Sequence, residues 1–273
     1  MPTTRQIRPK VAVAGWGALG KIVVQALIED PRYQLVAVGS QQIDVLTLYL
    51  QGQQSDARVC RSDQLASLAD VVIECLAPAA FAALAESLVD SGKTVIVLSA
   101  AALLKQQALL ANAEAGGVKV VVATGAIMGL DAVRAMRRDG ITDCLIVNRK
   151  RPAGLAGAPY VTAHAIDLAA ITQPTLIFKG TAHEAALGFP QNVNVAVALS
   201  LAACGTRATR CEIWADPLVA GNMHSITVKS KSAELSMTTV GVPDVANPRS
   251  SVLAAHSALA ALDSLFSPLR IGS

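Results

Sequence analysis

The chain has 273 residues, of which 52% are hydrophobic and only 3% aromatic, and its formal net charge is +3. The basic residues are scattered and lack the aromatic partners of a nucleic-acid-binding surface, so we expect no nucleic acid partner. The apolar runs are too short to span a bilayer and the first residues carry no apolar signal core, which predicts a cytoplasmic protein without a membrane partner. Five cysteines without metal-ligand spacing predict reduced thiols and no metal site.

The first chemical signal is a glycine-rich turn near the start of the chain. The apolar run 11–14 leads into Gly15, Gly17 and Gly20, and a helix-like stretch follows at 21–27. This order fits a dinucleotide-binding turn: Gly15 permits a tight turn, Gly17 lets the backbone approach a pyrophosphate, and Gly20 lets the helix lie close to the strand. The pyrophosphate would then rest on N–H groups at the helix N-terminus. The alternative interpretation is a turn that binds nothing.

Strand and helix signals alternate through the rest of the first half. Short β-branched runs predict strands at 34–38, 70–74, 94–98 and 118–122. Alanine- and leucine-rich stretches at 79–90 and 103–115 predict helices between them. This alternation favours right-handed βαβ units in a parallel sheet. We therefore predict an α/β fold with a Rossmann-type, doubly wound dinucleotide-binding domain at 1–131.

The pattern changes in the second half, where we expect a smaller α+β domain at 132–245 for substrate binding and dimerisation. The expected strands are 143–148, 175–178, 209–214, 225–230 and 233–240. The last of them alternates polar and apolar residues, which is typical of a sheet with one exposed face. A helix near 192–203 is expected to cover the other face. A C-terminal helix within 246–273, with apolar residues at helical spacing over 251–266, is expected to pack back on the first domain.

A second cofactor signal is the end of the second predicted strand, which carries no carboxylate. NAD-specific domains place an Asp or Glu there to bind the ribose hydroxyls, whereas this strand ends Val38-Gly39-Ser40. A 2′-phosphate would meet no repulsion and Ser40 could donate to it, with Arg58 or Arg61 as sources of positive charge. The cofactor is thus NAD or NADP, and we expect NADP to be tolerated.

Five segments together resemble the L-aspartate dehydrogenase family, and they extend over nearly the whole chain. The segments are Val72–Pro78, Thr124–Asp131, Phe189–Ala196, Ala215–Pro217 with Asn222–His224, and Asn247–Ser251. Three departures lie in loops where nicotinamide or substrate would bind: Met128 replaces the usual Gly, Leu76 replaces a small residue, and 99–102 reads Ser-Ala-Ala-Ala. The resemblance therefore implies the chemistry more firmly than the substrate.

The resemblance assigns roles to individual residues. It implies that His224 is the catalytic histidine, which suits general acid–base work because imidazole titrates nearest neutrality. It implies cofactor contacts from Ala126 and Asn194, with Asn192 then left to cap the helix. The full set expected to contact the cofactor is Gly15, Gly17, Ala18, Leu19, Gly20, Ser40, Cys75, Ala77, Ala126 and Asn194.

Substrate binding is less well indicated. The run Arg149–Arg151 could supply donors to carboxylates, although a run of charges is usually a solvated face. Asp131 and Asp216 are interpreted as scaffold. The other histidines, His164, His183 and His256, are weaker candidates for catalysis than His224.

The resemblance implies an NAD(P)-dependent amino acid dehydrogenase that interconverts L-aspartate with oxaloacetate and ammonia through iminosuccinate. It also implies a homodimer, with a small amino or oxo acid and ammonia as partners. Released iminosuccinate could feed pyridine nucleotide biosynthesis, and the physiological direction stays open. Two alternatives remain: a reductase of another imino or oxo acid, and a nucleotide-sensing protein without catalysis.

Overall fold

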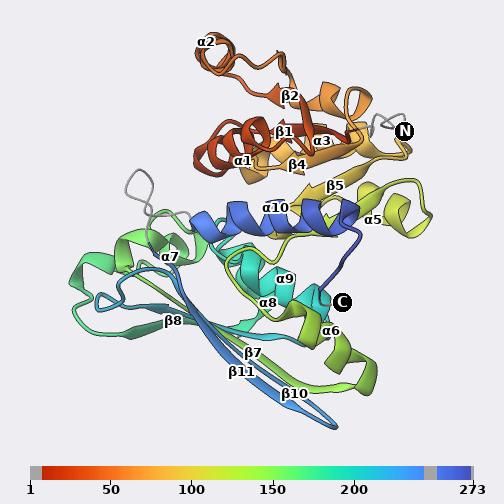
Figure 1. The fold of residues 1–273 in the computed structure, drawn as a ribbon. Helices are drawn as coiled ribbons and strands as arrows, with labels where there is room; N and C mark the ends of the chain where they lie inside the picture. Colours follow the sequence, from red (N-terminus) through yellow and green to blue (C-terminus); the bar gives the residue numbers. More distant parts are fainter. Residues whose placement is uncertain (1–7, 243–250, 272–273) are drawn as a thin grey trace. The chain divides into compact units, whose positions relative to one another are not determined.

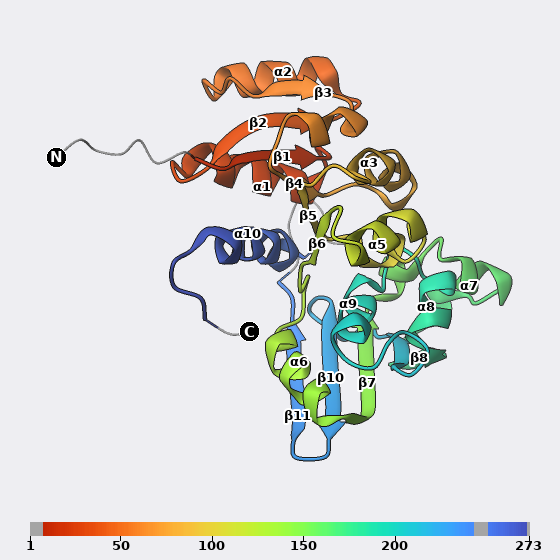
Figure 2. The ribbon, with the colours of Figure 1, turned by 90° about the vertical axis from the view of Figure 1, so that its right-hand side faces the viewer.

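The structure is a computed structural model that describes residues 8–242 and 251–271 (Figures 1 and 2). The chain divides into two compact units, Met1–Val121 and Val122–Ser273. The domain limits expected from the sequence stay a prediction. Residues 247–250, part of one resembling segment, and the start of the predicted region 246–273 lie outside the described residues.

Unit 1 is built on a six-stranded sheet in the order β3-β2-β1-β4-β5-β6. The pairs β1–β2, β1–β4, β2–β3 and β4–β5 are parallel, and the central strands are rich in fully buried Val, Ile and Ala. The strands are β1 Lys10–Ala14, β2 Gln34–Gly39, β3 Arg58–Cys60, β4 Val71–Glu74, β5 Thr94–Val97 and β6 Lys119–Val122. The order, which reverses at β1, confirms the predicted doubly wound fold.

Helices connect these strands and differ from expectation in two places. The predicted helix 103–115 is found as α5, which begins four residues later at Gln107, and a separate short helix of buried residues, Ala100–Leu103, precedes it. A further helix, α2, was missed because it leaves Ile43, Val45 and Leu48 exposed. The helices are α1 Ala18–Glu29, α2 Ile43–Gly52, η1 Ser62–Ser67, η2 Pro78–Ala80, α3 Phe81–Leu88, α4 Ala100–Leu103 and α5 Gln107–Glu114.

Unit 2 contains a five-stranded mixed sheet in the order β11-β10-β7-β9-β8. Only β7–β9 is parallel among its pairs, and the other three are antiparallel. The strands are β7 Ile141–Lys150, β8 Thr175–Thr181, β9 Arg210–Ala215, β10 Met223–Ser230 and β11 Glu234–Val240. Alternate residues of β7, β9 and β10 are buried, which gives the sheet an inner and an outer face.

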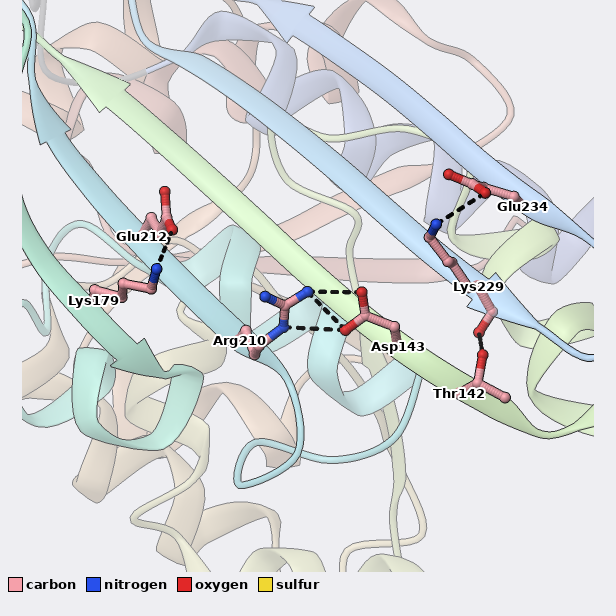
Figure 3. Close-up of polar contacts among 7 residues, drawn as sticks. All are labelled: Thr142, Asp143, Lys179, Arg210, Glu212, Lys229 and Glu234. Atoms are coloured by element: carbon pink, nitrogen blue, oxygen red, sulfur yellow. Dashed lines mark hydrogen bonds and ion pairs between the residues drawn. The ribbon is translucent and has the colours of Figure 1, made fainter.

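The outer face carries polar pairs that cross between neighbouring strands (Figure 3). Arg210 binds both carboxylate oxygens of Asp143, the shorter contact being 2.7 Å. Lys229 pairs with Glu234 at 3.1 Å, and Lys179 with Glu212 at 3.5 Å. One face of this sheet is therefore solvated, as the alternating pattern predicted.

The remaining helices of unit 2 include the predicted helices near 192–203 and 251–266, found as α9 and α10. In α10, Ser257 Oγ accepts a hydrogen bond of 3.0 Å from the backbone N–H of Gly125. The packing of α10 on the first domain stays a prediction. In the part of the chain that the structure describes, no helix is long and apolar enough to cross a membrane. The helices are α6 Leu130–Asp139, η3 Pro152–Leu155, α7 Pro159–Ala163, η4 Leu168–Ala170, α8 Ala182–Gly188, α9 Asn194–Ala202 and α10 Val252–Phe266.

Candidate active site

The glycine turn of unit 1 has a geometry that only glycine tolerates at two positions. Gly15 has φ +109°, and a Cβ there would lie 2.6 Å from the carbonyl oxygen of Cys75. A Cβ on Gly20 would lie 2.1 Å from the carbonyl oxygen of Gly15. Gly17 is the N-cap of α1, and a Cβ there would meet nothing within 4 Å among the described residues. The turn is therefore closed on the protein side and open at Gly17, as a pyrophosphate cradle requires.

The first turn of α1 supplies the donors of this cradle. Ala18, Leu19 and Gly20 form that turn, and no side chain in the described ranges caps it. Helix geometry leaves the first N–H groups without intrahelical acceptors, and the helix dipole favours an anion beside them. These residues fit the diphosphate of a dinucleotide.

Ser40, Cys75 and Ala77 follow the carboxyl ends of β2 and β4, beside the turn. The N–H of Gly15 donates to Gly39 O at 2.8 Å, and the N–H of Cys75 donates to Ala14 O at 2.8 Å. The structure thus brings together all the cofactor residues predicted in unit 1, at the edge of the sheet where such folds bind ligands.

The region after β2 bears on the choice between NAD and NADP. Ser40 Oγ accepts a 3.0 Å bond from the N–H of Gln42, which leaves its hydroxyl hydrogen to donate. Of the two arginines considered, Arg61 follows the carboxyl end of β3, and it already binds Asp63 at 2.7 Å. Arg58 begins β3 and so lies toward the other edge.

Glu74 is a buried carboxylate at this edge that the sequence analysis did not single out. Its side chain is 0% exposed and accepts backbone N–H bonds from Leu76 at 2.7 Å, Ser99 at 2.9 Å and Leu98 at 3.2 Å. Burial raises the pKa of Glu74, and the bonds from Ser99 and Leu76 oppose that rise. One side chain thereby holds the loops that follow β4 and β5. The only available signal was a carboxylate ending an apolar strand.

In unit 2, His224 lies on the inner face of the sheet and is 5% exposed. It is paired in register with Asn148 of β7, and its Nδ1 lies 2.7 Å from Asn148 Oδ1. An amide oxygen only accepts, so Nδ1 carries the hydrogen and Nε2 keeps a lone pair. The amide nitrogen of Asn148 faces Cys211 Sγ at 3.6 Å.

The electrostatics of the cluster keep this histidine neutral. Burial, followed by the positive charge of Lys150, lowers the pKa of His224 to about 3. Burial likewise lowers the pKa of Lys150 to about 8. At neutral pH the imidazole is therefore an unprotonated base beside a lysine that is still mostly charged.

Asn192 and Asn194 stand at the start of α9. The expectation that Asn192 caps this helix is wrong: the N-cap is Val193, and Asn192 Oδ1 instead accepts a 3.1 Å bond from Lys150 Nζ. The carboxamide oxygen of Asn192 binds the ammonium of Lys150 because a charged donor makes a stronger hydrogen bond than a neutral backbone N–H would. Asn194 is the first residue of α9. Its predicted contact with the cofactor stays a prediction.

Ala126 lies close to the same end of α9. It is buried, and the preceding Gly125 has φ +68°, with a Cβ there predicted to fall 3.6 Å from Val195 Cγ1. A compact loop next to the helix start thus brings Ala126 near the residues that surround Asn194. Met128 follows in this loop and is 38% exposed.

The basic run 149–151 is divided by the alternation of β7. Arg149 turns to the outer face, where it pairs with Asp216 at 3.2 Å and lies over the Trp214 ring at 4.6 Å. Arg151 is exposed and donates to Val219 O at 3.0 Å. Lys150 alone points inward and is 7% exposed. Counting in twos from Cys144 places Asn148 on the inner face within the predicted strand 143–148, and it places Lys150 there once the strand is known to extend to residue 150.

A doubly wound sheet with a pyrophosphate cradle, together with a buried neutral histidine, defines a nicotinamide-dinucleotide-dependent oxidoreductase. Residues 15–123 match the sequence model described as "Homoserine dehydrogenase, NAD binding domain", and residues 131–265 match "Aspartate dehydrogenase, C-terminal". The NAD(P) cofactor and the enzyme class predicted from the sequence are thereby confirmed.

Relatives extend the match to the whole chain. The chain is 39% identical over 264 residues to an L-aspartate dehydrogenase of Bradyrhizobium diazoefficiens, covering 97% of this chain and 94% of that protein. It is 38% identical to L-aspartate dehydrogenase 3 of Bordetella bronchiseptica, covering 96% and 97%. The fold resembles the crystal structure of an aspartate dehydrogenase from Thermotoga maritima, with a TM-score of 0.73 at 21% identity, covering 97% of this chain and all of that one. The chain belongs to the L-aspartate dehydrogenase family.

Proposed function

We propose that the chain catalyses the reversible NAD(P)-dependent conversion of L-aspartate and water to oxaloacetate and ammonia, by way of iminosuccinate. The observation that carries the proposal is the buried His224–Asn148 pair, which sits within the region matching the family model. Aspartate as substrate rests on the relatives named above.

A bound nicotinamide would supply the acceptor for the hydride that leaves the substrate Cα. The glycine turn and the first turn of α1 hold its diphosphate, and we assign Ser40, Cys75, Ala77, Ala126 and Asn194 to contacts with the rest of the dinucleotide. Because Gly15 and Gly20 leave no room for side chains, the turn is rigid and positions the cofactor without reorganisation.

We assign proton transfer to His224. Its Nε2 lone pair takes the proton that the substrate ammonium group loses before the imine forms, and releases it to solvent as the net proton of the reaction. The regenerated Nε2 then takes the proton of the water that adds to the imine carbon and returns it to the nitrogen as ammonia leaves. In the reverse direction the same atom returns these protons. Asn148 is a positioning residue, because its oxygen fixes the Nδ1–H tautomer and so keeps Nε2 free.

The test is turnover of NADH and NADPH by the purified protein with oxaloacetate and ammonia, beside a panel of other 2-oxo acids. We expect ammonia-dependent oxidation selective for oxaloacetate. His224→Ala should lower kcat by about 10²- to 10⁴-fold while the affinity for NAD(P)H is retained. Turnover with a different oxo acid alone would assign that acid as the substrate in place of oxaloacetate. The panel of oxo acids is worth testing because Met128, in the loop after Ala126, is exposed.

We further propose that the enzyme is cytoplasmic and acts as a homodimer. All five cysteines are free thiols, which suits a reducing compartment. Light scattering coupled to size-exclusion chromatography tests the oligomeric state, and a single monomeric species at micromolar concentration would rule out the homodimer.

A further inference from the structure

Lys150 is a buried cation that has no charged partner among the described residues. It ends β7 on the inner face, and the only hydrogen-bond acceptor of its Nζ within the described ranges is the neutral Asn192 Oδ1, at 3.1 Å. No carboxylate of those ranges lies within 4.0 Å of it, whereas the neighbouring Arg149 is paired with Asp216. Buried charges are ordinarily paired, because removing an ion from water costs several kcal/mol. The remaining N–H donors of Lys150 therefore suit an anion that the described residues do not supply.

The ammonium is placed beside the proposed base. Asn148 and Lys150 are two residues apart on β7 and so share one face, and His224 is paired with Asn148 across the strands. The positive charge of Lys150 contributes, after burial, to the lowered pKa of His224. Cys211 is a further titratable group among the described residues on this part of the face, and burial raises its pKa to about 12, so it stays an uncharged thiol.

We propose that Lys150 Nζ binds a carboxylate of the substrate and, together with Asn192, holds it next to His224. This inference rests on the proposed function, and it names the residue that recognises the acid. The substrate has two carboxylates, one on Cα and one on the side chain, and either is the right chemistry for a buried ammonium.

The same contact strengthens the base. A carboxylate bound at Lys150 offsets the positive charge that acts on His224, so its pKa moves upward from about 3 toward the range in which a general base works well at neutral pH. Recognition of the acid and activation of the histidine are thereby coupled, because an uncharged substrate would leave the imidazole a weak base.

The experiment measures binding apart from turnover. Succinate, an unreactive dicarboxylate, is titrated calorimetrically into the NADH-saturated protein, and its inhibition constant against oxaloacetate is measured in parallel. Lys150→Met keeps the length of the side chain without its charge, and we expect it to weaken succinate binding by about 10- to 100-fold. Arg149→Met and Lys179→Met, both on the outer face, are matched controls expected to change it less than about threefold.

Two further readouts separate charge recognition from a structural role. Wild-type affinity for succinate should fall above about pH 8 as Lys150 loses its proton, and Lys150→Met should lack that dependence. Lys150→Arg, which stays charged, should bind succinate through that range and serves as the test variant if Lys150→Met fails to fold. Comparing succinate with 2-oxobutyrate, whose single carboxylate is attached to the oxo carbon, identifies the carboxylate: a loss for both assigns the one on Cα, and a loss for succinate alone assigns the side-chain one.

Unchanged succinate affinity in folded Lys150→Met, with no difference in pH profile, would overturn the inference. That failure is distinct from a failure of the proposed function, which would show as absent turnover of oxaloacetate by the wild-type protein whatever the binding data say.

Discussion

His224 makes this protein sensitive to acid in a way that one substitution should remove. The imidazole is buried, its pKa is lowered from 6.5 to about 3 by burial and then by Lys150, and Asn148 accepts from its Nδ1–H. Between pH 6.5 and about pH 3, His224 is protonated in the unfolded chain but not in the folded chain. The free energy of unfolding must therefore fall as pH falls from 6.5 toward 3.

The size of the effect follows from the two pKa values. Each pH unit between them costs about 1.4 kcal/mol, so the full loss approaches about 5 kcal/mol. At pH 5 the loss relative to pH 7 is about 2 kcal/mol, a large fraction of the stability of an ordinary domain.

The assay compares wild type with His224→Gln by urea unfolding at pH 7 and pH 5. Glutamine keeps an N–H that can donate to Asn148 but does not titrate, so the variant should lose about 2 kcal/mol less than wild type on going to pH 5. Trp16 lies in unit 1 and Trp214 in unit 2, so fluorescence follows both units. His256→Gln, at an exposed site on α10, is the control and should behave as wild type. Equal losses in wild type and His224→Gln would refute the argument.

Four further substitutions test the rest of the site. Gly17→Ala, whose Cβ meets open space, should keep the melting temperature yet raise the Kd for NAD(P)H by about tenfold or more. Gly20→Ala should lower both the melting temperature and the affinity for NAD(P)H. Equal behaviour of the two variants would contradict the assignment of this turn to the diphosphate. Ser40→Asp retains a side-chain acceptor but adds a negative charge that repels a 2′-phosphate, so the ratio of kcat/KM with NADPH to kcat/KM with NADH should drop by at least about tenfold in steady-state kinetics. Asn148→Ala leaves the Nδ1–H of His224 without its acceptor and should lower kcat by about tenfold with little change in cofactor affinity, measured by fluorescence titration.

Much of the fold followed from local pattern. The glycine turn and the β-branched runs identified the parallel sheet of unit 1, and the alternation over 233–240 identified a sheet with one exposed face. The helix predicted over 103–115 begins four residues late, at Gln107, and the separate helix Ala100–Leu103 was not predicted, because where a helix begins depends on tertiary packing that the sequence does not display. The short strand β3, of three residues, gave too weak a signal to be singled out.

The site was predictable where a residue type is demanded by backbone geometry, as at Gly15 and Gly20. It was not predictable where two distant segments decide a role. Asn192 looks like a helix cap in sequence, and only the approach of Lys150 from another strand makes it a partner of a buried ammonium. Alternation along β7 could have separated Lys150 from Arg149, but the strand's extent to residue 150 had to be known first.

The three backbone bonds to Glu74 have a consequence for motion. The amides of Leu76, Leu98 and Ser99 come from loops more than twenty residues apart in sequence, yet all three end on one carboxylate. If either loop opens, the buried carboxylate of Glu74 loses hydrogen-bond donors. The two loops should therefore open together as one cooperative unit. Hydrogen exchange at these three amides should accordingly show a common free energy of opening. Exchange at all three should also slow together when a dinucleotide binds, because the loops after β4 and β5 move as one unit.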